Sequence, residues 1–161
     1  MRKTIFIGQA MPRKKSHPHD WPTLNLWLSS LGVGEDQIKR YFFYSALVNY
    51  FPGARNGSHL VPTPQMIAEE RSRLTRDIVS FGPEVVVPIG KLSIHYCLGI
   101  KEVLLTELIG KRFEADPYAM VGRKLVVVPL PHPSGASTWL QNKDHKLLLT
   151  RALTLLRESL N

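Results

Sequence analysis

The chain is poor in cysteine. Its 161 residues include one, Cys97, inside an apolar stretch that we expect to be a helix, where it would be a small core residue. A single cysteine excludes an internal disulfide and any zinc site or iron–sulfur cluster held by several cysteines of one chain. His59, His95 and His145 are scattered without the paired spacing of metal ligands. We therefore expect no metal site and no cofactor.

Long hydrophobic runs are also missing. No stretch approaches the ~20 apolar residues of a transmembrane helix, and the run from Thr4 to Gly8 is too short for a signal peptide. We expect a cytoplasmic protein with no membrane partner. The sequence contains no internal repeat and no glycine-rich phosphate loop. Its length and its 43% hydrophobic residues predict a single monomeric domain over residues 1–161.

Acidic residues are fewer than basic ones. The chain has 13 Asp and Glu against 21 Lys and Arg, which gives a formal net charge of +8 at pH 7. A surface with this excess attracts polyanions, and nucleic acid is the leading candidate.

Apolar runs and helical patterns alternate along the chain. The predicted strands are residues 4–7, 41–47, 85–89 and 125–128. Continuous apolar runs are typical of strands that helices cover on both faces, as in a parallel sheet. The predicted helices are residues 24–31, 63–80, 91–98 and 143–160. The fold class is therefore α/β, a three-layer α/β/α sandwich around a central four-stranded, mainly parallel sheet.

A rigid polar loop follows the last predicted strand. Residues 129–137 read Pro-Leu-Pro-His-Pro-Ser-Gly-Ala-Ser, and three prolines in five residues fix φ and remove backbone donors. His132 would project from the carboxyl end of a strand, where open α/β sheets bind their ligands. Ser134, Gly135 and Ser137 offer small side chains and accessible amides to a phosphate. A proline-rich turn with an incidental histidine would give the same pattern.

A second loop of interest follows the first predicted strand, at the same edge of the sheet. Gly8 allows a ligand to approach the backbone closely, and Gln9 can both donate and accept hydrogen bonds. The run Arg13-Lys14-Lys15 could bind phosphates. Each feature taken singly also has an ordinary structural role, as a turn glycine or a solvated charge run.

Together the two loops resemble those of the uracil-DNA glycosylase superfamily, and the resemblance covers nearly the whole chain. Residues 8–12, Gly-Gln-Ala-Met-Pro, look like its first motif, and residues 132–137, His-Pro-Ser-Gly-Ala-Ser, look like its more specific second motif. Residues 45–53 and 61–64 resemble the strand, Pro-Gly loop and helix start of the iron–sulfur branches, families four and five.

The resemblance implies a DNA glycosylase that hydrolyses the N-glycosidic bond of a flipped-out uracil and leaves an abasic site in base-excision repair. The implied partner is uracil-containing DNA, single- or double-stranded. His132 would hydrogen-bond the pyrimidine O2 as negative charge develops on the departing base. The backbone after Gly8 would contact the base and help to place the water. Three small residues of the second motif, Ser134, Gly135 and Ser137, would hold the flanking phosphates.

The catalytic loop departs from the family in its acidic residue. Active members usually carry a carboxylate in the first motif, whereas this chain has Gln9 and Ala10 there. Asp20 is the nearest downstream carboxylate and is our candidate for a catalytic role, with helix capping or a surface position as its alternative. A water held by Gln9, His17 or His19 is the other possibility.

Further departures concern the iron–sulfur cluster, the side chain that fills the vacated base stack and the residues that bind the base. The iron–sulfur relatives have cysteines where Tyr50 and Glu70 fall, so the cluster must be absent. Ala136 stands where a leucine fills the vacated base stack, and Trp139 or Leu140 could substitute for it. The asparagine that reads the uracil edge falls near Ala46. The remaining candidate base-binding residues are Ala10, Trp21 as the stacking ring, Ser45 and Asn49.

Three alternatives to uracil hydrolysis stay open. The missing carboxylate favours a DNA-binding relative with weak or no hydrolysis, whereas the presence of His132 argues against it. The change at the position of the asparagine that reads the uracil edge is also compatible with another deaminated base, such as hypoxanthine. A small-molecule nucleotide-binding protein of similar topology is the most remote alternative, since fold alone does not determine function.

Overall fold

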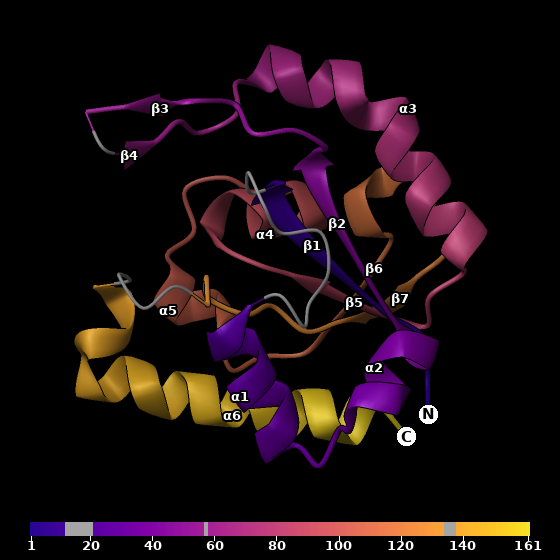
Figure 1. The fold of residues 1–161 in the computed structure, drawn as a ribbon, viewed down its shortest axis with the longest axis vertical. Coiled ribbons are helices and arrows are strands. Elements are labelled where there is room, and N and C mark those ends of the chain that lie inside the picture. Colours follow the sequence, from indigo (N-terminus) through magenta and orange to yellow (C-terminus); the bar gives the residue numbers. More distant parts are fainter. Residues whose placement is uncertain (12–20, 57, 134–137) are drawn as a thin grey trace.

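The computed structural model describes residues 1–11, 21–56, 58–133 and 138–161, and its centre is a five-stranded sheet (Figure 1). The strands, in sheet order, are β2 (Phe42–Val48), β1 (Thr4–Ala10), β5 (Val85–Pro88), β7 (Leu125–Val127) and β6 (Phe113–Ala115). The first four run parallel and β6 runs antiparallel to β7. The carboxyl ends of four strands therefore meet at one edge of the sheet.

The predicted α/β class and mainly parallel sheet are confirmed, but the prediction of four strands is wrong. The missed strand, β6, is three residues long and pairs only with β7 at the edge of the sheet. Its central residue, Glu114, is exposed, so β6 lacks the continuous apolar run used to predict the others. β1 is also longer than predicted, because Gly8 and Ala10 pair with Ala46 and Val48 of β2.

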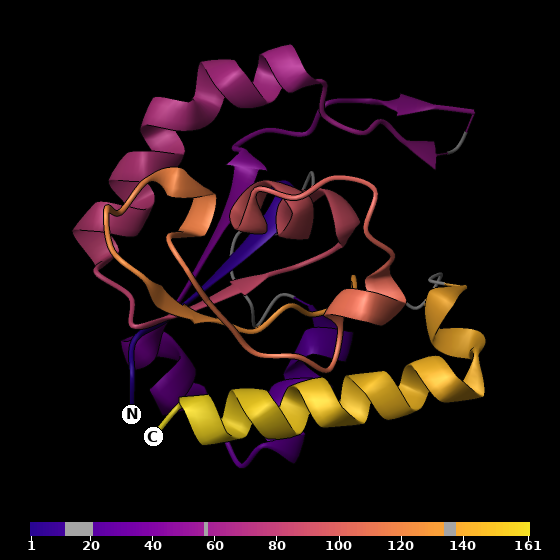
Figure 2. The ribbon, with the colours of Figure 1, turned by 180° about the vertical axis from the view of Figure 1, so that it is seen from behind.

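Three helices cover one face of the sheet: α1 (Pro22–Ser30), α2 (Glu35–Tyr41) and α6 (Lys143–Ser159) (Figures 1 and 2). Helix α2 was not predicted, and Tyr41, expected to begin a strand, is its last residue. Ile38 is its one buried residue, so its sequence carries no apolar periodicity. In α6, the Asn142 side chain caps the helix by accepting hydrogen bonds from the backbone N–H groups of Asp144 and His145.

Helices α3 (Pro64–Phe81) and α4 (Lys91–Leu98), with the short 3-10 helix η2 (Pro117–Ala119), lie on the other face. The start of α3 is as predicted, because the Thr63 hydroxyl accepts a hydrogen bond from the backbone N–H of Met66. The helix ends at Gly82, whose φ of 64° few other residues adopt. Smaller elements are the hairpin β3 (Ala54–Arg55) and β4 (Ser58–His59), α5 (Leu105–Leu108) and η3 (Trp139–Gln141).

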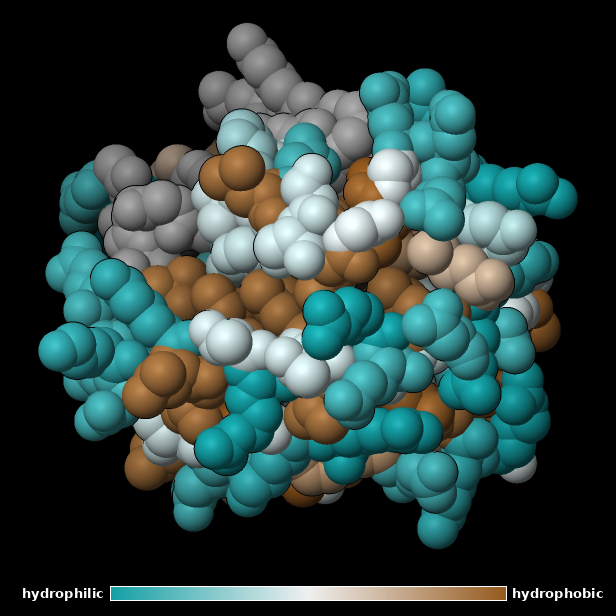
Figure 3. Space-filling model, turned by 90° about the horizontal axis from the view of Figure 1, so that it is seen from below, coloured by the Kyte–Doolittle hydropathy of each residue, from teal (hydrophilic) through white to brown (hydrophobic). Residues whose placement is uncertain are grey.

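The sheet separates two clusters of buried side chains. Phe6, Leu28 and Val87 belong to the cluster under α1, α2 and α6, whereas Ile7 and Ile78 belong to the cluster under α3 and α4. Viewed from below, the surface shows hydrophobic side chains set among hydrophilic ones (Figure 3). Among the described residues, no helix is long and apolar enough to cross a membrane.

Candidate active site

The carboxyl edge of the sheet brings together the segments before α1 and after β7. Trp21, which directly precedes α1, is buried, and its ring centroid lies 5.6 Å from that of His132, with an angle of 57° between the ring planes. Trp21 also contacts Tyr44 of β2, with ring centroids 5.4 Å apart and an interplanar angle of 45°. These residues, with Gly8, are called the His132 cluster below. The structure thus joins His132 and Trp21, two of the predicted site residues, through a direct ring contact.

The backbone that carries His132 is fixed to the neighbouring strand. The chain continues past β7 beside β5, where the Leu130 N–H donates to the Pro88 carbonyl at 3.0 Å and the Gly90 N–H donates to the Leu130 carbonyl at 2.9 Å. Pro131 and Pro133 are buried on either side of the half-buried His132. The imidazole therefore has a well-defined position at the sheet edge, as the proline-rich sequence predicts.

Tyr44 completes the His132 cluster, and sequence reasoning missed it. Its side chain is 4% exposed, and its hydroxyl lies 2.6 Å from the point where a Cβ atom on Gly8 would stand. Gly8 is therefore required by a close approach of the Tyr44 phenol, which takes the space beside β1. Burial raises the pKa of Tyr44 well above the ordinary tyrosine value of 10.0, so the phenol is neutral and keeps its proton to donate. A tyrosine within an apolar strand was the available signal, because a buried phenol needs a polar partner.

Of the other predicted site residues in the described ranges, Gln9 lies beside the His132 cluster and the rest lie apart from it. Side chains alternate along a strand, so Ser45 faces away from Tyr44 and donates its hydroxyl proton to Asp77 of α3 at 2.7 Å. Ala10 packs against the buried cluster under α3 and α4. Asn49 is exposed just beyond β2, and its backbone N–H donates to Glu70 Oε1 at 2.7 Å. Gln9 is half-buried within β1, next to Gly8.

Several predictions fall on residues outside the described part of the chain. These are Arg13, Lys14, Lys15, His17, His19 and Asp20 before α1, and Ser134, Gly135, Ala136 and Ser137 after His132. Their roles in phosphate binding and water activation stay predictions.

Trp139, a candidate for the side chain that fills the vacated base stack, is held in place by α6. Its ring stacks on His145 with centroids 4.2 Å apart and an interplanar angle of 19°, and His145 Nδ1 lies 2.6 Å from the Trp139 carbonyl. Both Trp139 and Leu140 are half-buried against the cluster under α1, α2 and α6. This stack anchors the segment that follows the second motif.

The residues present do not fit an iron–sulfur cluster. The one cysteine, Cys97, is buried in α4, and the positions expected for cluster ligands hold Tyr50 and Glu70. Glu70 instead accepts the hydrogen bond from Asn49 N–H, which joins α3 to the segment after β2. Within the described ranges, no group of three or more His, Cys, Asp or Glu side chains could hold a metal ion.

The His132 cluster places a half-buried imidazole against two buried aromatic rings, Trp21 and Tyr44, at the carboxyl edge of a parallel sheet. An imidazole N–H at this position could donate to an oxygen that gains negative charge. Fold and site together define an α/β/α protein with an imidazole at the carboxyl edge of its sheet, where open α/β sheets bind their ligands.

Comparison with known families gives the particular class. The family model described as Uracil DNA glycosylase superfamily matches residues 3–154, and the chain belongs to this superfamily. The chain is also similar to a DNA polymerase of Bacillus phage SP01, with 28% identity over 111 residues. That match spans 69% of this chain but only 10% of the polymerase.

Proposed function

We propose that this chain hydrolyses the N-glycosidic bond between uracil and deoxyribose in DNA. The observation that carries the proposal is the Trp21–His132 ring contact, which joins the segment before α1 to the loop after β7 at the carboxyl edge of the sheet. Membership of the superfamily supports the same conclusion.

The reaction breaks the bond between N1 of uracil and C1′ of the sugar. The electron pair of that bond leaves with the base, and negative charge spreads onto O2, where an imidazole N–H of His132 donates a hydrogen bond. Water adds its oxygen to C1′ and gives up a proton, and one proton returns to the uracil anion, so the products are an abasic sugar and free uracil. Trp21 and Tyr44, both buried, support the imidazole from within the protein, and the Tyr44 phenol lies beside Gly8.

The test is base release from single-stranded and duplex oligonucleotides that carry one uracil, followed by alkaline cleavage of abasic sites. Parallel substrates carry hypoxanthine or a thymine mismatch. His132→Ala should lower the rate of uracil release at least ~10²-fold with little loss of DNA affinity, as for other single donors to a developing anion.

His95→Gln is a matched control, because His95 lies on α4 with its Nε2 near the Val103 carbonyl and outside the His132 cluster. It should retain the wild-type rate. An unchanged rate in His132→Ala would remove His132 from the mechanism.

DNA recognition without hydrolysis is the second candidate. The observation that favours it is the pair Gln9 and Ala10, which puts no carboxylate at the start of the first motif. The similarity to part of a phage DNA polymerase is compatible with either function on DNA. Tight, salt-sensitive binding of uracil-containing DNA without release of any base would establish recognition alone.

A further inference from the structure

A cavity lies on the opposite side of the sheet from the His132 cluster. It has a volume of about 300 Å³, near the lower end of the range for small-molecule pockets. Ile67, Leu74 and Tyr118, which line it, belong to the buried cluster under α3 and α4, whereas Trp21 and Tyr44 belong to the other cluster. The cavity is therefore separate from the candidate active site.

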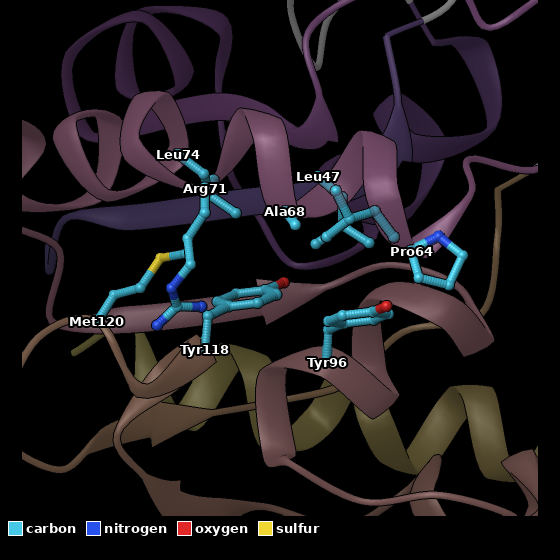
Figure 4. Close-up of a pocket in the computed structure, with 9 residues that line it drawn as sticks. Leu47, Pro64, Ala68, Arg71, Leu74, Tyr96, Tyr118 and Met120 are labelled. Carbon is cyan, nitrogen blue, oxygen red and sulfur yellow. The ribbon is translucent and has the colours of Figure 1, made fainter.

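Apolar side chains line one wall of this cavity, and two aromatic rings line the opposite wall. Side chains of α3 and the end of β2, including Leu47 and Ala68, line one side (Figure 4). The rings of Tyr96 from α4 and Tyr118 from η2 lie on the other side, facing α3 (Figure 4). An apolar slot with aromatic rings on one wall suits a planar aromatic molecule, which can bury both of its faces there.

The ring of Tyr118 is held rigidly. Ser93 donates its hydroxyl proton to the Ile7 carbonyl at 2.6 Å, so the Tyr118 hydroxyl, 2.7 Å from Ser93 Oγ, must donate to Ser93. Tyr118 and Ala119 both have left-handed backbones, with φ of 57° and 54°, which is uncommon for residues other than glycine. A strained backbone that fixes an aromatic side chain at a cavity wall is an arrangement often found at ligand sites.

Among the described residues that line the cavity, Arg71 is the only charged one. Its side chain extends from α3 toward Tyr118, beside Met120 (Figure 4), and Nη2 donates to the Ala119 carbonyl at 3.3 Å. Arg71 forms no ion pair with any residue that the structure describes. The adjacent acid, Glu70, is turned instead toward Asn49 and Arg73. The cationic group at the cavity therefore lacks an anionic partner within the described ranges.

We propose that this cavity is a ligand site for a planar aromatic molecule that carries one anionic group. The ring lies between α3 and the two tyrosines, and the anion accepts hydrogen bonds from the Arg71 guanidinium. A nucleotide, free or within a DNA strand, shares this chemistry with aromatic carboxylates and sulfonates. The site goes beyond the proposed hydrolysis and does not depend on His132.

The test is a fluorescence titration of the full chain with 1-anilinonaphthalene-8-sulfonate, an aromatic sulfonate, and with N-phenyl-1-naphthylamine, its uncharged counterpart. Arg71→Gln should weaken sulfonate binding at least about tenfold, the effect of losing one charge-assisted hydrogen bond, and should leave binding of the uncharged probe unchanged. Arg71→Lys should restore most of the lost affinity. Ala68→Phe, at an exposed helix position, should fill the slot and weaken both probes.

Two control variants test whether the probes bind at this cavity and not elsewhere on the protein. Arg76→Gln, an exposed position on α3 away from the cavity, should bind like the wild type, and so should His132→Ala. Thermal unfolding of each variant establishes that the folded protein is being compared. Displacement of the sulfonate by thymidine monophosphate would identify a free nucleotide as the ligand class, and displacement only by a single-stranded oligonucleotide would identify a DNA strand. Displacement by neither would leave another aromatic acid as the ligand.

Absence of saturable sulfonate binding to the folded chain would overturn the proposal. Equal affinities in the wild type, Arg71→Gln and Ala68→Phe would also overturn it, as would loss of binding in His132→Ala. None of these results bears on base release, so failure here and failure of the proposed hydrolysis are distinguishable.

Discussion

The hydroxyl of Tyr44 occupies the space that a side chain at residue 8 would need. A Cβ atom on Gly8 would stand 2.6 Å from that oxygen, and the Tyr44 ring cannot move aside because it is buried against Trp21. Gly8→Ala should therefore destabilise the protein by about 1 to 3 kcal/mol, the usual cost of overpacking a core, as measured by chemical unfolding.

The double variant Gly8→Ala/Tyr44→Phe tests the cause of that loss. Without the hydroxyl, the nearest Tyr44 atom to the new methyl group is Cζ at 3.5 Å, an ordinary contact, so Gly8→Ala should cost much less in the Tyr44→Phe background. Gly34→Ala serves as the control, because only Gln37 Oε1 comes near, at 4.0 Å. If Gly8→Ala lowers stability equally in the wild-type and Tyr44→Phe backgrounds, the Tyr44 hydroxyl is not the reason that residue 8 is a glycine.

At the scale of elements, β2 and α3 are joined by Arg73. Its guanidinium donates to Asp77 Oδ2 at 2.7 Å, to Ser45 Oγ at 3.0 Å and to the Ala46 carbonyl at 2.6 Å, with the side chain only 15% exposed. These contacts attach the helix to the strand that carries Tyr44, so Arg73 also supports the His132 cluster from the opposite face of the sheet.

Removing the charged group takes one donor from each hydrogen-bonding partner of Arg73. Arg73→Met should lower the free energy of unfolding by about 2 to 4 kcal/mol, because Asp77 and the Ala46 carbonyl lose charge-assisted hydrogen bonds at a partly buried position. Chemical unfolding measures the loss. Arg76→Met, further along the same helix and exposed, should change stability by less than about 0.5 kcal/mol. Comparable losses in both variants would mean that the Arg73 contacts contribute little.

Elements with strong local signals were predicted well, and the others were not. Helix α3 has its Thr63 cap, a proline at its first position and Ile67, Leu74 and Ile78 on one face, so its sequence alone defines it. Helix α2 and strand β6 bury little, and each is stabilised by neighbours that the local sequence does not reveal. The strand β1 was predicted too short, because the glycine taken as the end of the strand is instead paired with Ala46.

At the scale of the whole molecule, the net charge of +8 should make DNA binding depend strongly on salt. If Arg13, Lys14 and Lys15 bind phosphates, replacing all three with Gln should lower the slope of log K against log salt concentration by up to about 2.7 on duplex DNA. Binding titrations at several salt concentrations measure the slope.

Arg123→Gln/Lys124→Gln is a control for charge that removes two cations, so its effect is compared per charge with that of the triple variant. These exposed residues precede β7, at the amino edge of the sheet and far along the strand from the His132 cluster. Their loss should change the slope much less per charge. Equal changes per charge in the two variants would assign binding to overall charge rather than to the loop.

Two buried tyrosines should make the folded protein sensitive to alkali. Burial raises the pKa of both Tyr44 and Tyr118 above the ordinary value of 10.0, so above that pH the unfolded chain loses protons that the folded chain keeps. The contribution of each tyrosine to stability is complete below about pH 10 and falls above it by up to ~1.4 kcal/mol per pH unit.

Thermal unfolding from about pH 8 to about pH 11 measures this effect. Tyr44→Phe should reduce the alkaline loss of stability, whereas Tyr50→Phe, at a 41% exposed position, should leave it unchanged. An equal alkaline loss of stability in the wild type, Tyr44→Phe and Tyr50→Phe would attribute the effect to other groups.

The sequence by itself determined the α/β class, the long helices, the proline-rich presentation of His132 and the membership of the superfamily. These rest on local patterns, since periodicity, caps and prolines act within a few residues. Only the tertiary structure decided that Tyr44 meets Gly8 and Trp21, that Ser45 faces Asp77 and Arg73, and that a cavity opens beside Tyr118. Those contacts join residues far apart in the chain. Strand pairing and the alternation of side chains across the sheet determine which of them meet.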